Sequence, residues 1–344
     1  MSHFQVIEHT AQCQLCRERP GAVKPGHESQ LKLAVKQYIP LDNLSPKEGD
    51  VTIIGAHANG FPKGQSGVLN EDILGDDPSW WDHGRDLLSL INQFQGQMSQ
   101  PLVGIGHSMG GMQLAHLSLL HPSLFEALVL VDPVIQGGNP SRPYAVPSTY
   151  RRDLWPSRAE ATEKIQSSPF YKSWDPPQEL FTFLRSSYID ERSGLPRGVQ
   201  EDEMYADDMD DFPFYRPEPR QMLQRLPDLK PSVLYLFGSK SELSTPVSRQ
   251  QKLEITGTGV GGSGGVAKGR VKEAVLPCGH LVPMELVEEC ARASADFVDF
   301  ELSAWESRRS QFHRAWSEVS HHERTAIDDQ WKAHIGPLAK KSKI

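Results

Sequence analysis

Short apolar runs recur along the chain, each bounded by glycine, proline or charged residues. They cover residues 51–54, 102–105, 127–131 and 233–237, and a further strand pattern follows at 271–276. Runs of this length are typical of strands that are buried in a parallel sheet. The pattern therefore predicts a mostly parallel sheet.

Two helices with one apolar face are predicted between the first three of these strands. We expect the first helix to be capped by Asp77, with Pro78 at its first position. Its apolar face carries Trp80, Trp81, Leu87, Leu88, Ile91 and Phe94. The second helix follows residues 102–105, and its apolar side includes Met112, Ala115 and Leu119. Strands that alternate with helices in this way predict an α/β fold with helices on both faces of the sheet.

The alternation stops between residues 134 and 230, which we interpret as an inserted lid. Two stretches in it, 157–168 and 178–188, are predicted as short helices, and the acidic run 201–211 as a solvated loop. The first part of the core then comprises residues 1–133. Its second part comprises residues 231–344 and includes a largely helical C-terminal extension from 284 to about 332.

Composition and charge narrow the class of protein. The formal net charge is −8, so there is no basic field to attract nucleic acid. No apolar run approaches the ~20 residues that span a bilayer, and the first residues lack the pattern of a signal peptide. Four cysteines form no disulfide framework, and Cys13 and Cys16 lack a second pair at zinc-ligand spacing. We expect no metal and no cofactor.

A candidate nucleophile lies between the second predicted strand and the helix that follows it. Residues 106–110, Gly-His-Ser-Met-Gly, match the pattern G-x-S-x-G. The glycines leave room for a sharp turn that presents the serine hydroxyl above the sheet. Ser108 is therefore the predicted nucleophile.

A serine nucleophile needs a histidine base and an acid, which in this arrangement follow in the order serine, acid, histidine. His280 is the candidate base, since it follows a strand through a tight turn. Four later histidines lie on a helical stretch and are expected at its surface; they are His313, His321, His322 and His334. Asp132, directly after 127–131, is the favoured acid. Glu242, after 233–237, is the alternative, because Ser241 occupies the position where a carboxylate often lies.

Two further features bear on substrate binding. The backbone N–H of Met109 and that of Phe61, beside Gly60, are the predicted oxyanion donors, and His57 is expected to brace the same loop. Residues 256–265 are rich in glycine. They form either a flexible loop or an anion-binding nest beside Lys268 and Arg270.

The last three residues, Ser342-Lys-Ile344, differ only by leucine to isoleucine from the peroxisomal address S-K-L. They predict a peroxisomal protein that is recognised by the import receptor.

Taken together, these motifs resemble the α/β-hydrolase superfamily. The loop 57–63, the elbow 106–111 and the glycine-rich stretch 256–265 are similar to those of fungal peroxisomal acyl-CoA hydrolases of secondary-metabolite biosynthesis, of the mycophenolic acid and AK-toxin type. The resemblance implies a lid, a triad of Ser108, Asp132 and His280, and a CoA thioester substrate.

Other functions stay open. A carboxylesterase or lipase acting on oxygen esters is one alternative, and a non-catalytic binding protein with this fold is another. If CoA is the handle of the substrate, we expect cations near the mouth of the site to contact its phosphates. The candidates are Arg142, Arg151, Arg152, Lys268 and Arg270.

Deleting residues 342–344 is expected to move a fusion with an N-terminal fluorescent tag from puncta to the cytosol. Activity in vitro should not change, because such tripeptides are read by a receptor and do not fold the chain. Microscopy of the truncated and full-length fusions checks this expectation. Puncta that persist after the deletion would show that the ending is only a tail.

Overall fold

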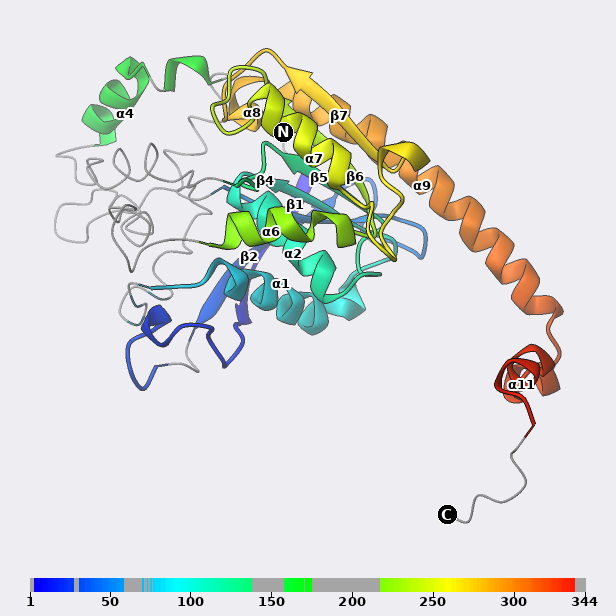
Figure 1. The fold of residues 1–344 in the computed structure, drawn as a ribbon. Coiled ribbons are helices and arrows are strands. Elements are labelled where there is room, and N and C mark those ends of the chain that lie inside the picture. The colour runs from blue at the N-terminus through cyan, green and yellow to red at the C-terminus, as the bar shows by residue number, and fades with distance from the viewer. Residues whose placement is uncertain are drawn as a thin grey trace. The chain divides into compact units, whose positions relative to one another are not determined.

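The predicted strands pair into one parallel sheet (Figure 1). The structure is a computed structural model, which describes residues 3–27, 31–58, 70, 73, 75, 77–137, 158–169, 171–174 and 217–337. The strand order is β3-β4-β5-β6-β7, and every neighbouring pair is parallel. The strands are β3 (Thr52–Ala56), β4 (Leu102–His107), β5 (Ala127–Val131), β6 (Ser232–Gly238) and β7 (Val271–Leu276). This sheet confirms the predicted α/β class.

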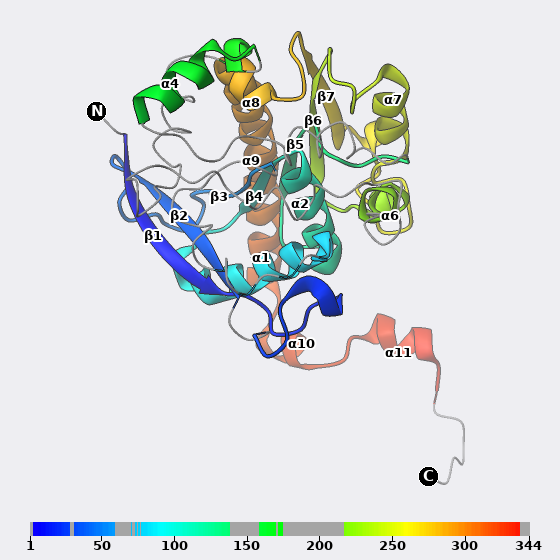
Figure 2. The ribbon, with the colours of Figure 1, turned by 90° about the vertical axis from the view of Figure 1, so that its left-hand side faces the viewer.

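Helices cover both faces of the sheet, as the alternation of side chains along its strands shows. One face forms the main core with three helices, α1 (Trp80–Phe94), α2 (Met109–Leu120) and α6 (Glu218–Arg225). On β7, Val271 belongs to this core, whereas the ammonium of the next residue, Lys272, lies 3.6 Å from the ring centroid of Phe300. Phe300 belongs to α9 (Val287–Glu318), so the part of α9 up to Glu301 covers the opposite face (Figure 2).

A two-stranded antiparallel sheet precedes the parallel one, and no sequence pattern indicated it. It pairs β1 (Phe4–Gln12) with β2 (Lys32–Pro40). Ala11 is fully buried in the main core, and Leu33 and Val35 pack against that core, while Phe4 and Tyr38 stay exposed. The hairpin therefore buries only part of one face, which leaves a weak periodic signal. Among the described strands, β3 is an edge of the parallel sheet.

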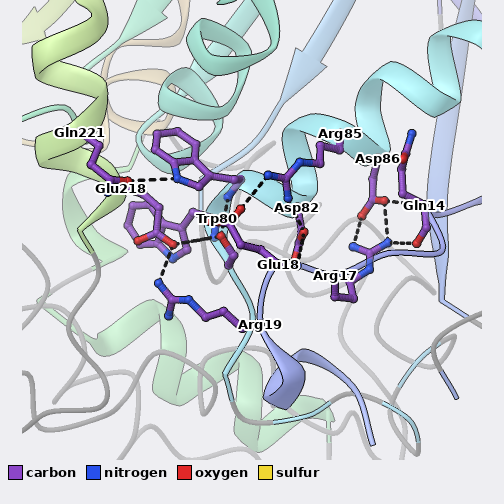
Figure 3. Close-up of polar contacts among 12 residues, drawn as sticks. Gln14, Arg17, Glu18, Arg19, Trp80, Asp82, Arg85, Asp86, Glu218 and Gln221 are labelled. Carbon is purple, nitrogen blue, oxygen red and sulfur yellow. Dashed lines mark hydrogen bonds and ion pairs between the residues drawn. The ribbon is translucent and has the colours of Figure 1, made fainter. Parts of the chain in front are cut away.

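Ion pairs attach the segment after β1 to the first helix (Figure 3). Arg17 binds the carboxylate of Asp86 on α1 through both terminal nitrogens, each at 2.8 Å. Arg19 binds Asp77 at 2.8 Å and Glu218 of α6 at 3.0 Å. The buried Glu218 also accepts the backbone N–H of Trp80. This cluster fixes the start of α6, where the described chain resumes after the predicted lid.

The cap of α1 differs from the prediction. Ser79 is the N-cap, and its hydroxyl accepts the N–H of Trp81 at 3.2 Å. The Asp77 carboxylate binds the guanidinium of Arg19 instead. The helix begins two residues later than expected, and Glu218 accepts the N–H of its first residue, Trp80.

The helices that remain agree with the predicted pattern where the structure describes it. In the predicted lid, α4 (Arg158–Ser167) matches the first expected helix, and residues 178–188 and 201–211 lie outside the described residues. After β6 come α7 (Pro246–Ile255), α8 (Val282–Glu285) and α9, then α10 (His321–Thr325) and α11 (Asp329–Ile335). The chain divides into one compact unit, Met1–Glu301, and a second, Leu302–Ile344.

No helix in the part of the chain that the structure describes is long and apolar enough to cross a membrane.

Gly238 ends β6 at the closest approach between this strand and the loop after β7. A Cβ atom at this position would lie 1.9 Å from the carbonyl oxygen of Gly279. The backbone contacts Ser239 N–H to Leu276 O and Lys240 N–H to Cys278 O, at 2.8 and 2.9 Å, hold the two segments together. A side chain at residue 238 would push the loop away.

Gly238→Ala is therefore expected to lower the free energy of unfolding by about 1–3 kcal/mol or more, since the clash is with backbone. Gly96→Ala is the matched control, because a Cβ there meets nothing within 4 Å. Denaturant unfolding of both variants measures the difference. Equal stability of the two would contradict the close contact.

Candidate active site

Ser108 lies on a sharp turn between β4 and α2. Its φ of 56° is in the left-handed region, which is unusual for a residue with a side chain. The turn is held by hydrogen bonds from Ser108 N–H to Val131 O at 2.9 Å and from Val134 N–H to Ser108 O at 3.1 Å.

The flanking glycines leave the space that this turn requires. A Cβ at Gly106 would lie 2.7 Å from the carbonyl carbon of Gly110, and one at Gly110 would lie 2.3 Å from Ala56 O. The structure thus gives the physical reason for the glycines in G-x-S-x-G.

The structure brings Ser108, His280 and Asp132 into one hydrogen-bonded chain. His280 Nε2 lies 2.9 Å from Ser108 Oγ, and His280 Nδ1 lies 2.6 Å from Asp132 Oδ2. The carboxylate can only accept, so Nδ1 carries a proton and donates it, which leaves Nε2 to accept the serine hydroxyl. This arrangement can remove the proton of the hydroxyl and hold the resulting imidazolium beside a negative charge.

Asp132 is fully buried at the end of β5, and its φ is 41°. Burial is the largest single influence on its pKa and raises it, but hydrogen bonds from His280 and Ser241 and the charge of His280 act in the opposite direction. The net pKa of Asp132 is therefore lowered from its ordinary value. The N–H of Gly238 lies 3.4 Å from the other carboxylate oxygen. The site keeps the acid ionised.

Glu242, the alternative acid, has an exposed side chain, and the structure pairs His280 with Asp132. The preceding residue, Ser241, is buried, and its hydroxyl donates to Asp132 Oδ2 at 2.6 Å. The turn after β6 thus contributes a hydroxyl to the site.

His107 is a neighbour of the site that sequence reasoning missed. Its Nε2 donates to the carbonyl of His280 at 2.9 Å, and the two rings lie 5.0 Å apart. Burial, followed by the charge of His280, lowers the pKa of His107 to about 3. His107 is therefore neutral at ordinary pH and braces the backbone of His280. Its place directly before Ser108 in the motif was the only available signal.

The predicted oxyanion donors are only partly described. Met109 is the first residue of α2, where amide N–H groups have no acceptor within the helix. Phe61 and Gly60 lie outside the described residues. Nearby, His57 Nδ1 donates to Ala58 O at 2.6 Å, which agrees with a bracing role for that histidine.

Comparison with known proteins identifies the family. A model described as alpha/beta hydrolase family matches residues 60–298. The chain belongs to the alpha/beta hydrolase family. It is 31% identical to the type I acyl-CoA thioesterase mpaH' of Penicillium brevicompactum over 426 aligned positions, which cover 97% of this hydrolase and 96% of the relative.

Two further proteins are similar to this hydrolase. The abhydrolase domain-containing protein AFT2-1 of Alternaria alternata is 28% identical over 69% of this chain and 98% of its own length. Among solved structures, the peroxisomal alpha-beta-hydrolase Lpx1 of Saccharomyces cerevisiae has a TM-score of 0.71 and 17% identity. The match covers 97% of this chain and all of that one, and it supports the fold.

The glycine-rich stretch of this hydrolase is an ordered turn that packs on the chain before β6. The N–H groups of Gly257, Gly259 and Ser263 donate to the carbonyls of Leu226, Pro227 and Leu229. Other amides bond within the loop, as that of Gly264 does to Gly257 O at 2.8 Å. An anion-binding nest requires amides that point outward, so the nest interpretation is wrong. The flexible-loop interpretation does not describe this hydrogen-bonded turn either.

Arg270 and Lys268 lie at the wrong edge of the sheet to contact a substrate at Ser108. Both precede β7, whereas the site follows the other end of the strands. Six residues of β7 span about 20 Å at ~3.3 Å each. Arg270 also binds Glu126 at 3.4 Å and Glu301 at 2.9 Å. The prediction that these two cations contact CoA is therefore wrong, and Arg142, Arg151 and Arg152 lie outside the described residues.

Among the residues that the structure describes, no group of three His, Cys, Asp or Glu side chains could hold a metal ion.

Asp132→Asn is expected to lower kcat by about 10⁴, because an amide no longer selects the tautomer that His280 needs. Glu242→Gln, the matched control, removes an exposed carboxylate and leaves the bond between His280 and Asp132 in place, so kcat should stay within about twofold. Steady-state kinetics of both variants measure the order of the losses. The reverse order would move the acid to Glu242.

Proposed function

We propose that the protein is a serine hydrolase that cleaves an acyl-CoA thioester through an acyl-enzyme. The proposal rests on the hydrogen-bonded chain from Ser108 through His280 to Asp132. Ser108 Oγ attacks the acyl carbonyl while His280 Nε2 accepts its proton. The N–H of Met109, with that of Phe61, stabilises the oxyanion.

The thiol then leaves with the proton that His280 holds, and the acyl group stays on Ser108. Water then attacks the ester while the same imidazole takes its proton, and the imidazolium returns that proton to Ser108 Oγ as the free acid leaves. Asp132 remains ionised throughout, and its low pKa supports this role because the carboxylate must not take up the proton itself.

The choice of substrate is supported by similarity along nearly the whole chain. The Penicillium relative is named as a type I acyl-CoA thioesterase, and its identity of 31% extends over 97% of this chain. An oxygen-ester hydrolase would use the same three side chains and is the second candidate. A binding protein would not need the aligned proton path, which counts against a non-catalytic role.

The proposal places this activity in the peroxisome. The C-terminal Ser342-Lys-Ile344 supports this location, with the import receptor as partner, and the solved structure that shares the fold is named as peroxisomal.

Purified protein is expected to hydrolyse acyl-CoA with a kcat/KM at least tenfold above that for the same acyl group on a short thiol, N-acetylcysteamine. The scissile bond is the same in both, so the difference measures binding of the CoA handle at ~1.5–3 kcal/mol per phosphate contact. The matching ethyl ester is the third substrate. Thiol release and acid release measure the three rates.

Ser108→Ala should lose about 10⁶ in kcat on every substrate, which assigns the activity to this site. Ser118→Ala is the matched control, since that buried hydroxyl donates to Ala115 O within α2. Equal rates for the acyl-CoA and the N-acetylcysteamine thioester, together with a higher rate for the ethyl ester, would show that the protein is an esterase and not a thioesterase. Activity that survives in Ser108→Ala would overturn the nucleophile.

A further inference from the structure

Ser241 lies directly behind the Asp132 carboxylate, on the turn that ends β6. Its side chain is buried, with 7% of the residue exposed. Its Oγ is 2.6 Å from Asp132 Oδ2, the same oxygen that His280 Nδ1 contacts at 2.6 Å. One carboxylate oxygen thus accepts two short hydrogen bonds from segments that are far apart in the sequence.

The local backbone determines the direction of the Ser241 hydroxyl. Its oxygen accepts the N–H of Leu243 at 3.3 Å, so its own hydrogen is available to Asp132. Ser241 N–H donates to Gly238 O at 3.1 Å, and Ser244 N–H donates to Ser241 O at 3.3 Å, which anchor the turn on both sides. The Ser241 hydroxyl is therefore oriented to donate to the carboxylate of Asp132.

We infer that Ser241 is a positioning residue of the reaction: its hydroxyl holds the Asp132 carboxylate in the plane that His280 needs and stabilises its ionised form. This inference rests on the proposed serine hydrolase but does not depend on which acyl substrate is cleaved. It explains why the strand end that lacks an acid at residue 241 still contributes to the site. The hydroxyl acts on the acid that β5 supplies.

The titratable groups that face Asp132 allow a clear pH test. Burial lowers the pKa of His107 to about 3, and burial raises that of Cys278 to about 11. Lys252, fully buried on α7, has a pKa lowered to about 8, because burial outweighs the attraction of Asp132. None of these three groups therefore changes charge between about pH 4 and 7, so they do not obscure a shift of the profile in that range.

The test measures the rate at which a fluorophosphonate labels Ser108, as a function of pH. The probe forms a phosphorus–oxygen bond to Ser108 Oγ and releases fluoride, while His280 takes the serine proton. Labelling therefore reports the proton path without a known substrate. In Ser241→Ala we expect the labelling rate to fall about tenfold, the loss of one hydrogen bond to a charged group.

The acid limb of the profile should also move to higher pH in Ser241→Ala. The Ser241 hydrogen bond lowers the pKa of Asp132, so without the hydroxyl the ionised carboxylate is less stabilised and the site takes up a proton at a higher pH. A purely structural role would lower the amplitude and leave the midpoint unchanged. Ser241→Thr keeps a hydroxyl and should restore both the rate and the midpoint.

Ser232→Ala is the matched control, since it removes another buried serine hydroxyl from β6 at the far end of the strand. Thermal unfolding of each variant verifies that it is folded. If the wild-type protein is labelled and Ser241→Ala has the same rate and midpoint, the inference is wrong. If the folded wild-type protein is not labelled at all, the proposed serine-hydrolase function is wrong.

Discussion

The parallel register of four strands is the constraint on which the site depends. His107 of β4 is paired with Val131 of β5, and Val131 is paired with Leu236 of β6. Gly238 of β6 is in turn paired with Leu276 of β7. Because parallel strands in register end at the same edge, the residues that follow them meet there although up to 172 residues separate them in the sequence.

Close backbone packing turns this common edge into a site with defined distances. Two residues of the site, Ser108 and Asp132, have positive φ values, which the chain maintains only where its surroundings enforce them. Here each N–H donates to the neighbouring strand, Ser108 to Val131 O and Asp132 to Leu236 O. Glycines also let neighbouring segments approach closely, since a Cβ at Gly110 would meet the backbone of Ala56 and one at Gly238 that of Gly279.

Most of the buried carboxylates that the structure describes form ion pairs that stabilise the fold, whereas Asp132 belongs to the active site. Arginines form these ion pairs with buried carboxylates, as Arg17 does with Asp86 and Arg270 with Glu301. Asp132 differs, because among the described residues its only ion-pair partner is His280. A guanidinium at Asp132 would also lower its pKa, but it would compete with the imidazolium for the carboxylate. Neutral donors such as the Ser241 hydroxyl stabilise the charge and leave it available to His280.

The sequence by itself determined the strands, the elbow and the residue types of the site, because apolar runs and G-x-S-x-G are local patterns. It also favoured Asp132 over Glu242, from the position of each after its strand. It did not reveal the β1–β2 hairpin, the cap at Ser79 or the roles of His107 and Ser241. Each of these depends on a partner that is distant in the sequence.

The glycine-rich turn and Arg270 are a case in which a local pattern led to a wrong prediction. Their composition suggested a place for phosphates, and only the tertiary structure decided that they lie at the opposite edge of the sheet. A local pattern specifies which groups a segment offers, whereas the fold decides which groups they meet. For this protein the chemistry of the site was therefore readable from the chain, and its geometry and its supporting contacts were not.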